Sequence, residues 1–210
     1  MRQLLPMTFR PVVSLWIGVA AEFLCVVLMS RHGDFLQRGE SIRFTASAVA
    51  AGAAFWLAAR GLNKSAMPAN TRACWFWTVT VLLRLAMLPT FPGDDLWRYR
   101  WEGNIQLHGF NPYQLAPDSM ALAGWRDADW ERISHRDVPA IYPPLAEGVF
   151  AVMAWGGNSV FGYKGLFAIA DLGVCAVLRR MLASEGTPPE EAAWYAWSPL
   201  AVYVSAGAAH

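Results

Sequence analysis

Long uninterrupted apolar blocks constrain this chain more than any other feature of its sequence. Hydrophobic residues make up 55% of the 210 positions and charged residues only 16%. The apolar residues stand in runs rather than at the spacing of an amphipathic helix, and the run over 11–30 is long enough to cross a hydrocarbon layer of about 30 Å as a helix. The pattern predicts an all-α fold, a polytopic transmembrane helical bundle.

The predicted membrane crossings follow from the lengths of the apolar blocks. Pro92-Gly93 ends one block and Arg179-Arg180 ends another, whereas the block over 44–59 crosses only if it includes flanking residues such as Ile42. The shorter run over 145–155 suits an interfacial or re-entrant helix. We predict crossings over residues 11–30, 44–59, 73–91, 160–178 and 192–209. Because apolar sequence continues to the last residue, we expect residues 1–210 to be the N-terminal part of a longer protein.

A polar stretch over 92–144 separates the third crossing from the next. It holds half of the chain's 16 acidic residues and must lie in water or at the membrane surface. Arg179 and Arg180 favour a cytoplasmic position for the loop that follows them. If 145–155 does not cross, the acidic loop then faces outward. The arginine-containing loop over 31–43 would also face outward and fits the positive-inside rule less well.

Charge and cysteine content exclude several classes of function. The net charge is +1, so the composition predicts no nucleic-acid partner. Cys25, Cys74 and Cys175 each stand inside an apolar block, with no spacing that suggests a disulfide framework or a zinc site. They are expected to be small buried hydrophobic residues.

The densest charge in the chain directly follows Pro92-Gly93. Asp94 suits the N-cap of a helix over 95–108 that ends at Gly109. Capping, together with a favourable interaction with the helix dipole, is one explanation of the adjacent Asp94 and Asp95. A catalytic role for the pair is the other explanation.

Two faces of the predicted helix have different characters. Trp97, Trp101 and Ile105 recur at helical spacing as an apolar stripe, which predicts a helix lying on the membrane with its Trp rings in the headgroup zone. Another face carries charged residues at helical spacing, with an arginine placed to pair with the glutamate four positions later: Asp95, Arg98 and Glu102.

The chain from about residue 90 onward contains, in this order, the segments DDLWRYRWEGNIQLHGFNPYQLAPD, WERISHRDVPAIYPPLAEGVF, YKGLFAIADLGVCAVLRRML and AAWYAWSPLAVYVSAGAAH. Together they resemble the corresponding segments of bacterial GT-C class glycosyltransferases, which are mannosyltransferase-like integral membrane enzymes that use polyprenyl-phosphate sugars. The chain departs from the family in two ways. The acidic motif follows the third apolar block rather than the first, and the family's Gly-x-Gly-His-like turn reads AGAAH, ending at His210.

The resemblance implies a multi-pass enzyme of the bacterial inner membrane with its active site facing the periplasm or exterior. Such an enzyme moves a hexose, with mannose as one candidate, from a polyprenyl-phosphate donor to a hydroxyl of a lipid or glycan acceptor, among membrane lipids. The motif implies that the acidic residue with the catalytic role is Asp95, with Asp94 beside it. The two carboxylates could also hold a divalent cation, Mg²⁺ or Mn²⁺, and no other cofactor is expected. Residues 1–210 alone are expected to insert without transferring sugar.

The chemistry of such a transfer calls for the residue types found here. A positioned carboxylate accepts the proton of the acceptor hydroxyl, and cationic groups offset the charge of the departing phosphate. The candidate substrate contacts beyond the aspartates are Arg98, Tyr99, Arg100, Glu102, Tyr113, His135, Tyr142, Lys164 and His210.

Several of these candidates have simpler explanations. Asn111-Pro112-Tyr113 and Tyr142-Pro143-Pro144 predict rigid corners, since proline restricts the backbone, and Tyr113 could in addition line an acceptor groove. His135, a lone histidine in a loop, could be merely solvated.

Ionisable residues within the predicted crossings have alternatives of the same kind. Lys164 could bind a substrate phosphate, pair with Asp171 seven positions later, or extend its amine toward the membrane surface, as could Arg84. If Lys164 and Asp171 lined a translocation path, the protein would instead be a transporter or a lipid-binding membrane module. A catalytically inactive chain that simply inserts is a third reading.

Overall fold

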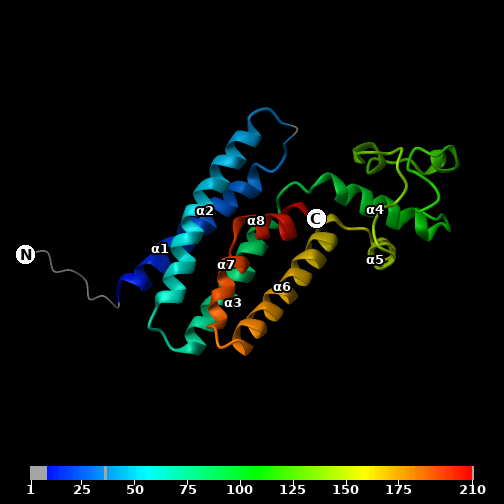
Figure 1. Cartoon of the computed structure of the whole chain (residues 1–210). Helices are drawn as coiled ribbons and strands as arrows, with labels where there is room; N and C mark the ends of the chain where they lie inside the picture. The colour runs from blue at the N-terminus through cyan, green and yellow to red at the C-terminus, as the bar shows by residue number, and fades with distance from the viewer. Residues whose placement is uncertain (1–8, 36, 210) are drawn as a thin grey trace, which may run out of the picture. The chain divides into compact units, whose positions relative to one another are not determined.

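The computed structural model describes residues 9–35 and 37–209, and Figure 1 shows that their regular secondary structure is helical, without a strand among them. The chain forms two compact units. The first contains the chain up to Phe91 together with Phe167–Gly207, and the second contains Pro92–Leu166 with the last residues.

The first unit is built on three helices, α1 (Phe9–Arg31), α2 (Glu40–Lys64) and α3 (Ala69–Met87), with most of α6 (Val160–Ser184). Glycines bring the backbones of α1 and α2 into contact. A Cβ added at Gly18 would lie 2.4 Å from the Ala58 nitrogen, and one added at Gly61 would lie 2.5 Å from the Leu15 nitrogen. Small residues permit the same close approach between helices in membranes.

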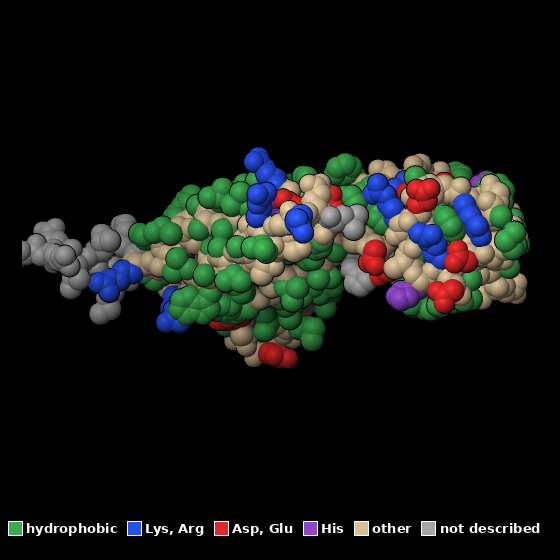
Figure 2. All heavy atoms as spheres, turned by 90° about the horizontal axis from the view of Figure 1, so that it is seen from above, with side chains coloured by type: hydrophobic (Ala, Val, Ile, Leu, Met, Phe, Trp, Pro, Cys, Tyr) green, Lys and Arg blue, Asp and Glu red, His purple; other side chains and the backbone are tan. Residues whose placement is uncertain are grey.

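Two of the described helices, α1 and α2, are long and apolar enough to cross a membrane. Large apolar side chains on both point away from the protein interior, among them Trp16, which is 60% exposed, and Val49, which is 70% exposed. Figure 2 shows hydrophobic side chains over much of the visible face of the first unit. The prediction of an all-α chain with apolar helices of crossing length is therefore confirmed.

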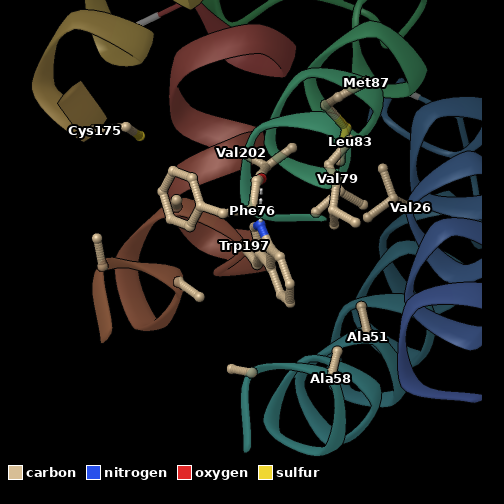
Figure 3. Packing of buried hydrophobic residues seen from close by; sticks show 14 of the residues in the cluster. Val26, Ala51, Ala58, Phe76, Val79, Leu83, Met87, Cys175, Trp197 and Val202 are labelled. Carbon is tan, nitrogen blue, oxygen red and sulfur yellow. Dashed lines mark hydrogen bonds between the residues drawn. The ribbon is translucent and has the colours of Figure 1, made fainter. Parts of the chain in front are cut away.

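The interior of the first unit centres on an aromatic pair from α3 and the C-terminal segment (Figure 3). The rings of Phe76 and Trp197 stack with centroids 6.4 Å apart. The indole N–H of Trp197 donates to Oγ1 of Thr80 at 3.0 Å, which satisfies the polar edge of a fully buried ring. Val79 and Leu83 pack beside them.

The segment over 192–209 is not one helix, so the sequence prediction there is wrong. It is divided into the short elements η3 (Pro189–Ala192), α7 (Ala193–Ala196), α8 (Pro199–Val202) and the π-helical turn η4 (Tyr203–Ala208). Pro199 is the physical cause. It lacks a backbone N–H and pushes Ser198 into an extended conformation, with ψ 124°.

Helix bounds elsewhere differ from the prediction mainly at the ends. Helix α2 does extend beyond 44–59 on both sides, as a crossing there requires. Helix α3 stops at Met87 rather than at 91, and α6 continues past Arg179-Arg180 to Ser184. A charged pair interrupts an apolar pattern without ending a helix, so it misplaces the predicted boundary.

The second unit contains α4 (Asp94–Leu107), η1 (Met120–Trp125), η2 (Trp130–Arg132) and α5 (Pro144–Trp155). Helix α4 begins after Gly93 and ends at Leu107, and Gly109, two positions later, has a φ of +83° that suits glycine just after a helix C-terminus. Helices α4 and α5 pack closely, since a Cβ added at Gly103 would lie 2.3 Å from the Phe150 carbonyl oxygen.

The apolar stripe of α4 is covered by protein, which corrects the expectation that it faces lipid headgroups. Trp101 and Ile105 are 1% and 0% exposed and pack against Leu122 and Ile133 of the loop that follows α4. Trp97 is also buried. The loop carries its own apolar residues, so it folds back over the stripe, and Figure 2 shows charged side chains on the visible face of this unit.

Candidate functional site

Asp94 is the first residue of α4 and not its N-cap, which corrects the sequence prediction. The cap position belongs to Gly93, whose extended backbone precedes the helix. Oδ1 of Asp94 accepts the N–H of Asp95 at 3.1 Å, and Oδ2 accepts the hydroxyl of Ser134 at 3.0 Å. Asp94 thus ties the start of α4 to the following loop through Ser134, a residue that sequence reasoning missed.

Asp95 stands in the first turn of α4, half-buried, and contacts the corner that precedes α5. The hydroxyl of Tyr142 donates to its Oδ1 at 3.2 Å. The hydroxyl of Tyr113 in turn donates to the Tyr142 carbonyl oxygen at 2.6 Å, and Oδ1 of Asn111 accepts the N–H of Tyr113 at 2.9 Å. The Tyr113 hydroxyl therefore joins the two proline corners predicted from the sequence, and the second corner contacts Asp95 through Tyr142.

Aromatic rings form one side of the Asp95 site. Tyr99 stacks on Phe150 with ring centroids 4.4 Å apart, and its edge meets Tyr142 at 5.0 Å. Burial, and after it the negative charge of neighbouring groups including Asp95, raises the pKa of Tyr142 well above its usual value. The Tyr142 phenol therefore remains a hydrogen-bond donor toward the carboxylate throughout the physiological pH range.

Arg98 is buried and connects α4 to the loop that follows it through hydrogen bonds. Its Nε donates to Oε1 of Glu102 at 2.7 Å, which confirms the predicted pair, and its Nη2 donates to the Val138 carbonyl oxygen at 2.6 Å. His135 also meets Arg98, but through its carbonyl oxygen at 3.4 Å, while the imidazole side is exposed and the backbone has a left-handed φ of 51°. The contact of His135 with the site is thus made by its backbone.

Arg100 is bound on a different part of the second unit. Its Nη1 pairs with Asp129 at 3.1 Å and its Nε donates to the Asn158 carbonyl oxygen at 2.9 Å. Both predicted phosphate contacts, Arg98 and Arg100, therefore already have protein partners. Any phosphate would have to share these donors.

A second pair of carboxyl groups, Glu102 and Glu147, lies between α4 and α5. Both residues are nearly fully buried, and Gln106 donates to Oε2 of Glu147 at 2.8 Å, whereas Oε2 of Glu102 and Oε1 of Glu147 have no hydrogen-bond partner among the described residues. Burial, together with the charge of Glu102, raises the pKa of Glu147 to about 8, and burial also raises the pKa of Glu102. A proton shared between the two carboxyls would satisfy these two buried oxygens.

Sequence reasoning missed Glu147 although a signal was present. It is the sole acidic residue in the apolar run over 145–155, and it falls in the first turn of the helix after the Tyr142-Pro143-Pro144 corner. Glu102 was predicted as a partner for Arg98 and as a candidate substrate contact, but not as a partner for a second carboxyl.

Comparison with known proteins returns no relative. No family model, characterised protein or solved structure matches the chain. The chemistry of the site therefore rests on its own residues. A half-buried carboxylate, oriented by a phenol at the start of a helix, is a group able to accept a proton from a hydroxyl.

A metal at this site would find few protein ligands. Within residues 9–35 and 37–209, no group of three or more His, Cys, Asp or Glu side chains could hold an ion. Mg²⁺ often binds through one or two carboxylates with substrate phosphates and water, so Asp94 and Asp95 fit such a shared site only in part.

The ionisable residues of α3 and α6 form a network of their own. Arg84, 2% exposed, pairs with Asp171 and donates to the Thr80 and Ala196 carbonyl oxygens at 2.9 Å each. Arg84 therefore does not extend toward the membrane surface. Oδ1 of Asp171 also accepts the Tyr195 hydroxyl at 2.5 Å.

These contacts exclude one of the interpretations of Lys164, its pairing with Asp171. Because Asp171 bonds to Arg84 and Tyr195, it is not the partner of Lys164, which is fully buried. His210, another candidate, lies outside the described residues.

Proposed function

We propose that this protein is a membrane glycosyltransferase that moves a hexose from a polyprenyl-phosphate donor to a hydroxyl of a lipid or glycan acceptor. The observation that carries the proposal is the Asp95 site. A carboxylate stands at the first turn of α4, half-buried, with a phenol donating to one oxygen at 3.2 Å. The motif around it is also the part of the sequence that resembles GT-C class enzymes.

In the proposed reaction Asp95 is the general base. Its carboxylate takes the proton of the acceptor hydroxyl while that oxygen attacks the anomeric carbon and the polyprenyl phosphate departs. A positioned base contributes about 10²- to 10⁴-fold in rate. Tyr142 fixes the orientation of the carboxylate, and Asp94 holds the loop against the start of the helix through Ser134.

Cations must offset the charge that builds on the departing phosphate. Arg100 is the more accessible arginine for this role, because its side chain is 19% exposed whereas that of Arg98 is 6% exposed and bonded on three sides. A divalent ion shared between Asp94, Asp95 and the phosphate is the alternative source of positive charge, and Lys164 is a third.

The exposed apolar surface supports a membrane location. Ile42, 76% exposed, and Trp56, 52% exposed, extend from α2, and such side chains are stable in contact with lipid rather than water. We propose a polytopic bundle in the bacterial inner membrane, with the acidic second unit on the outer side.

A transfer assay tests the proposal. The protein, expressed in full as its gene encodes it, is reconstituted into liposomes with a radiolabelled polyprenyl-phosphate hexose and a lipid extract as acceptor. We expect label to move from the donor to a second lipid or glycan fraction. Absence of transfer with mannose, glucose and galactose donors alike would contradict the proposal.

A further inference from the structure

A glutamate occupies the centre of the buried face of α1. The stripe that faces the interior recurs at helical spacing and consists of Leu15, Gly18, Glu22, Val26 and Met29. Glu22 is 0% exposed, the same value as Leu15 and Val26 on either side of it. Its position inside the apolar run over 11–30 is visible in the sequence, but the search for catalytic motifs passed over it.

The surroundings of Glu22 are tightly packed and apolar. One turn earlier, Gly18 lies so close to α2 that an added Cβ would stand 2.4 Å from the Ala58 nitrogen and 2.9 Å from the Ala54 carbonyl oxygen. Ala51, the next buried residue toward the start of α2, is 0% exposed. Ala51, Ala54 and Ala58, which are buried on this face of α2, carry methyl groups that cannot donate a hydrogen bond.

Both oxygens of the Glu22 carboxyl lack a hydrogen-bond partner among the described residues. On α1 the neighbouring titratable group is the Cys25 thiol. Helix α2 has none between Arg43 and Arg60. On α3, Cys74 is exposed and Arg84 is paired with Asp171.

We propose that Glu22 is a proton-binding site within the membrane-crossing part of the protein. An ionised carboxylate enclosed in apolar packing with no partner carries a cost that proteins avoid by keeping the group neutral. The site therefore holds a proton as its ligand while α1 and α2 are packed. The close contact of Gly18 with α2, one turn away, holds the two helices together, so we expect release of the proton to require them to separate.

This inference stands apart from the proposed sugar transfer, since Glu22 belongs to the first unit and the Asp95 site to the second. An ionisable residue inside a membrane marks a functional position more often than a structural one. Protonation at Glu22 would couple the packing of α1 against α2 to the proton concentration on one side of the membrane.

Infrared spectroscopy of the purified full chain in lipid tests the site. The carbonyl stretch of a protonated carboxyl is separate from that of a carboxylate. We expect the spectrum of the wild type minus that of Glu22→Gln at pH 7 to show a protonated-carboxyl band, still present at pH 8. The matched control is Asp171→Asn, whose difference spectrum shows only a carboxylate band because Asp171 is paired with Arg84. A carboxylate band for Glu22 at pH 7 overturns the proposal.

A second variant guards against a failure of Glu22→Gln to fold. Glu22→Leu removes the polar group and keeps an apolar side chain of similar length. An unpartnered neutral carboxyl loses nothing by this change, so we expect Glu22→Leu to fold in the same yield and unfold at the same or a higher temperature. A lower unfolding temperature would mean that the carboxyl has a partner it needs, and the proposal would be wrong.

Discussion

The hydroxyl of Tyr142 donates a hydrogen bond to Oδ1 of Asp95 over 3.2 Å and joins residues 47 positions apart in the chain. The contact links the first turn of α4 to the corner before α5. It gives the carboxylate a fixed direction while leaving the residue half-buried rather than enclosed. A group held in this way can act on a bound hydroxyl, and the contact makes the proposed activity testable by small changes.

Removing the Tyr142 hydroxyl is the first such change. Tyr142→Phe keeps the ring packing on Tyr99 but deletes the donor to Asp95. A hydrogen bond to a charged group contributes about 1.5 kcal/mol or more, so we expect transfer to fall about tenfold or more. Tyr113→Phe is the matched control. It deletes a bond to the Tyr142 carbonyl rather than to the carboxylate and should have the smaller effect. Equal effects would mean that both tyrosines act only on the fold.

The Glu102–Glu147 pair predicts a pH dependence of stability in the second unit. Because the folded-state pKa of Glu147 is raised to about 8, the folded protein holds a proton that the unfolded chain releases above about 4.5. Stability is therefore fully present below the unfolded pKa and is lost as pH rises toward 8. Each pKa unit corresponds to about 1.4 kcal/mol, so a loss of a few kcal/mol is expected.

Hydrogen exchange of α4 and α5 amides between pH 5 and pH 8, corrected for intrinsic exchange, measures this loss. Glu147→Gln keeps a neutral side chain at every pH and should flatten the dependence. Asp118→Asn, at an exposed loop residue, should leave it unchanged. A wild-type profile that is flat, or that rises with pH, would show that the two carboxyls do not share a proton.

The buried ion pair between α3 and α6 predicts a large effect on stability. Arg84→Met leaves the Asp171 carboxylate buried without its cation, which costs about 3–5 kcal/mol. Replacing both residues, Arg84→Met with Asp171→Leu, should restore much of the loss. The control is Arg43→Met, whose pair with Glu40 is exposed on the arginine side and contributes less than about 1 kcal/mol. Unfolding temperatures in a single detergent compare the three variants.

The sequence predicts the helices of this chain better than it predicts their contacts. Apolar run length was enough to locate α1 and α6, and helical spacing was enough to pair Arg98 with Glu102. Proline predicts a helix break at Pro199, because it lacks a backbone N–H. The long apolar run over 192–209 instead suggested one continuous helix.

Contacts between residues far apart in the sequence could not be predicted. Nothing in the spacing of Tyr142 and Asp95 brings them together, because loop closure depends on the packing of everything between. The same is true of Arg84 with Asp171, which were each assigned a separate role. Trp101 was predicted to contact lipid headgroups, because a stripe of Trp residues has the same sequence pattern whether a loop or a membrane covers it.

The orientation of the acidic unit can be tested by cysteine labelling. In a chain freed of its own cysteines, Ser119→Cys lies in the loop expected to face outward, and Glu185→Cys lies in the exposed turn after α6, expected to face the cytoplasm. A membrane-impermeant maleimide applied to intact cells should label the first and label the second only after permeabilisation. The reverse pattern would invert the topology and place Asp95 on the cytoplasmic side.

The most direct test of the account is the rate of sugar transfer by Asp95→Asn. The change keeps the size of the side chain and an oxygen for the Tyr142 hydroxyl, but removes the base. We expect transfer from a polyprenyl-phosphate hexose to fall by about 10²-fold or more, with unchanged expression and insertion. Asp94→Asn, which retains an oxygen for Ser134, should lose far less unless a metal is bound there, and a chelator would reveal that case. Transfer by Asp95→Asn at a rate near that of the wild type would contradict the assignment of Asp95 as the catalytic base.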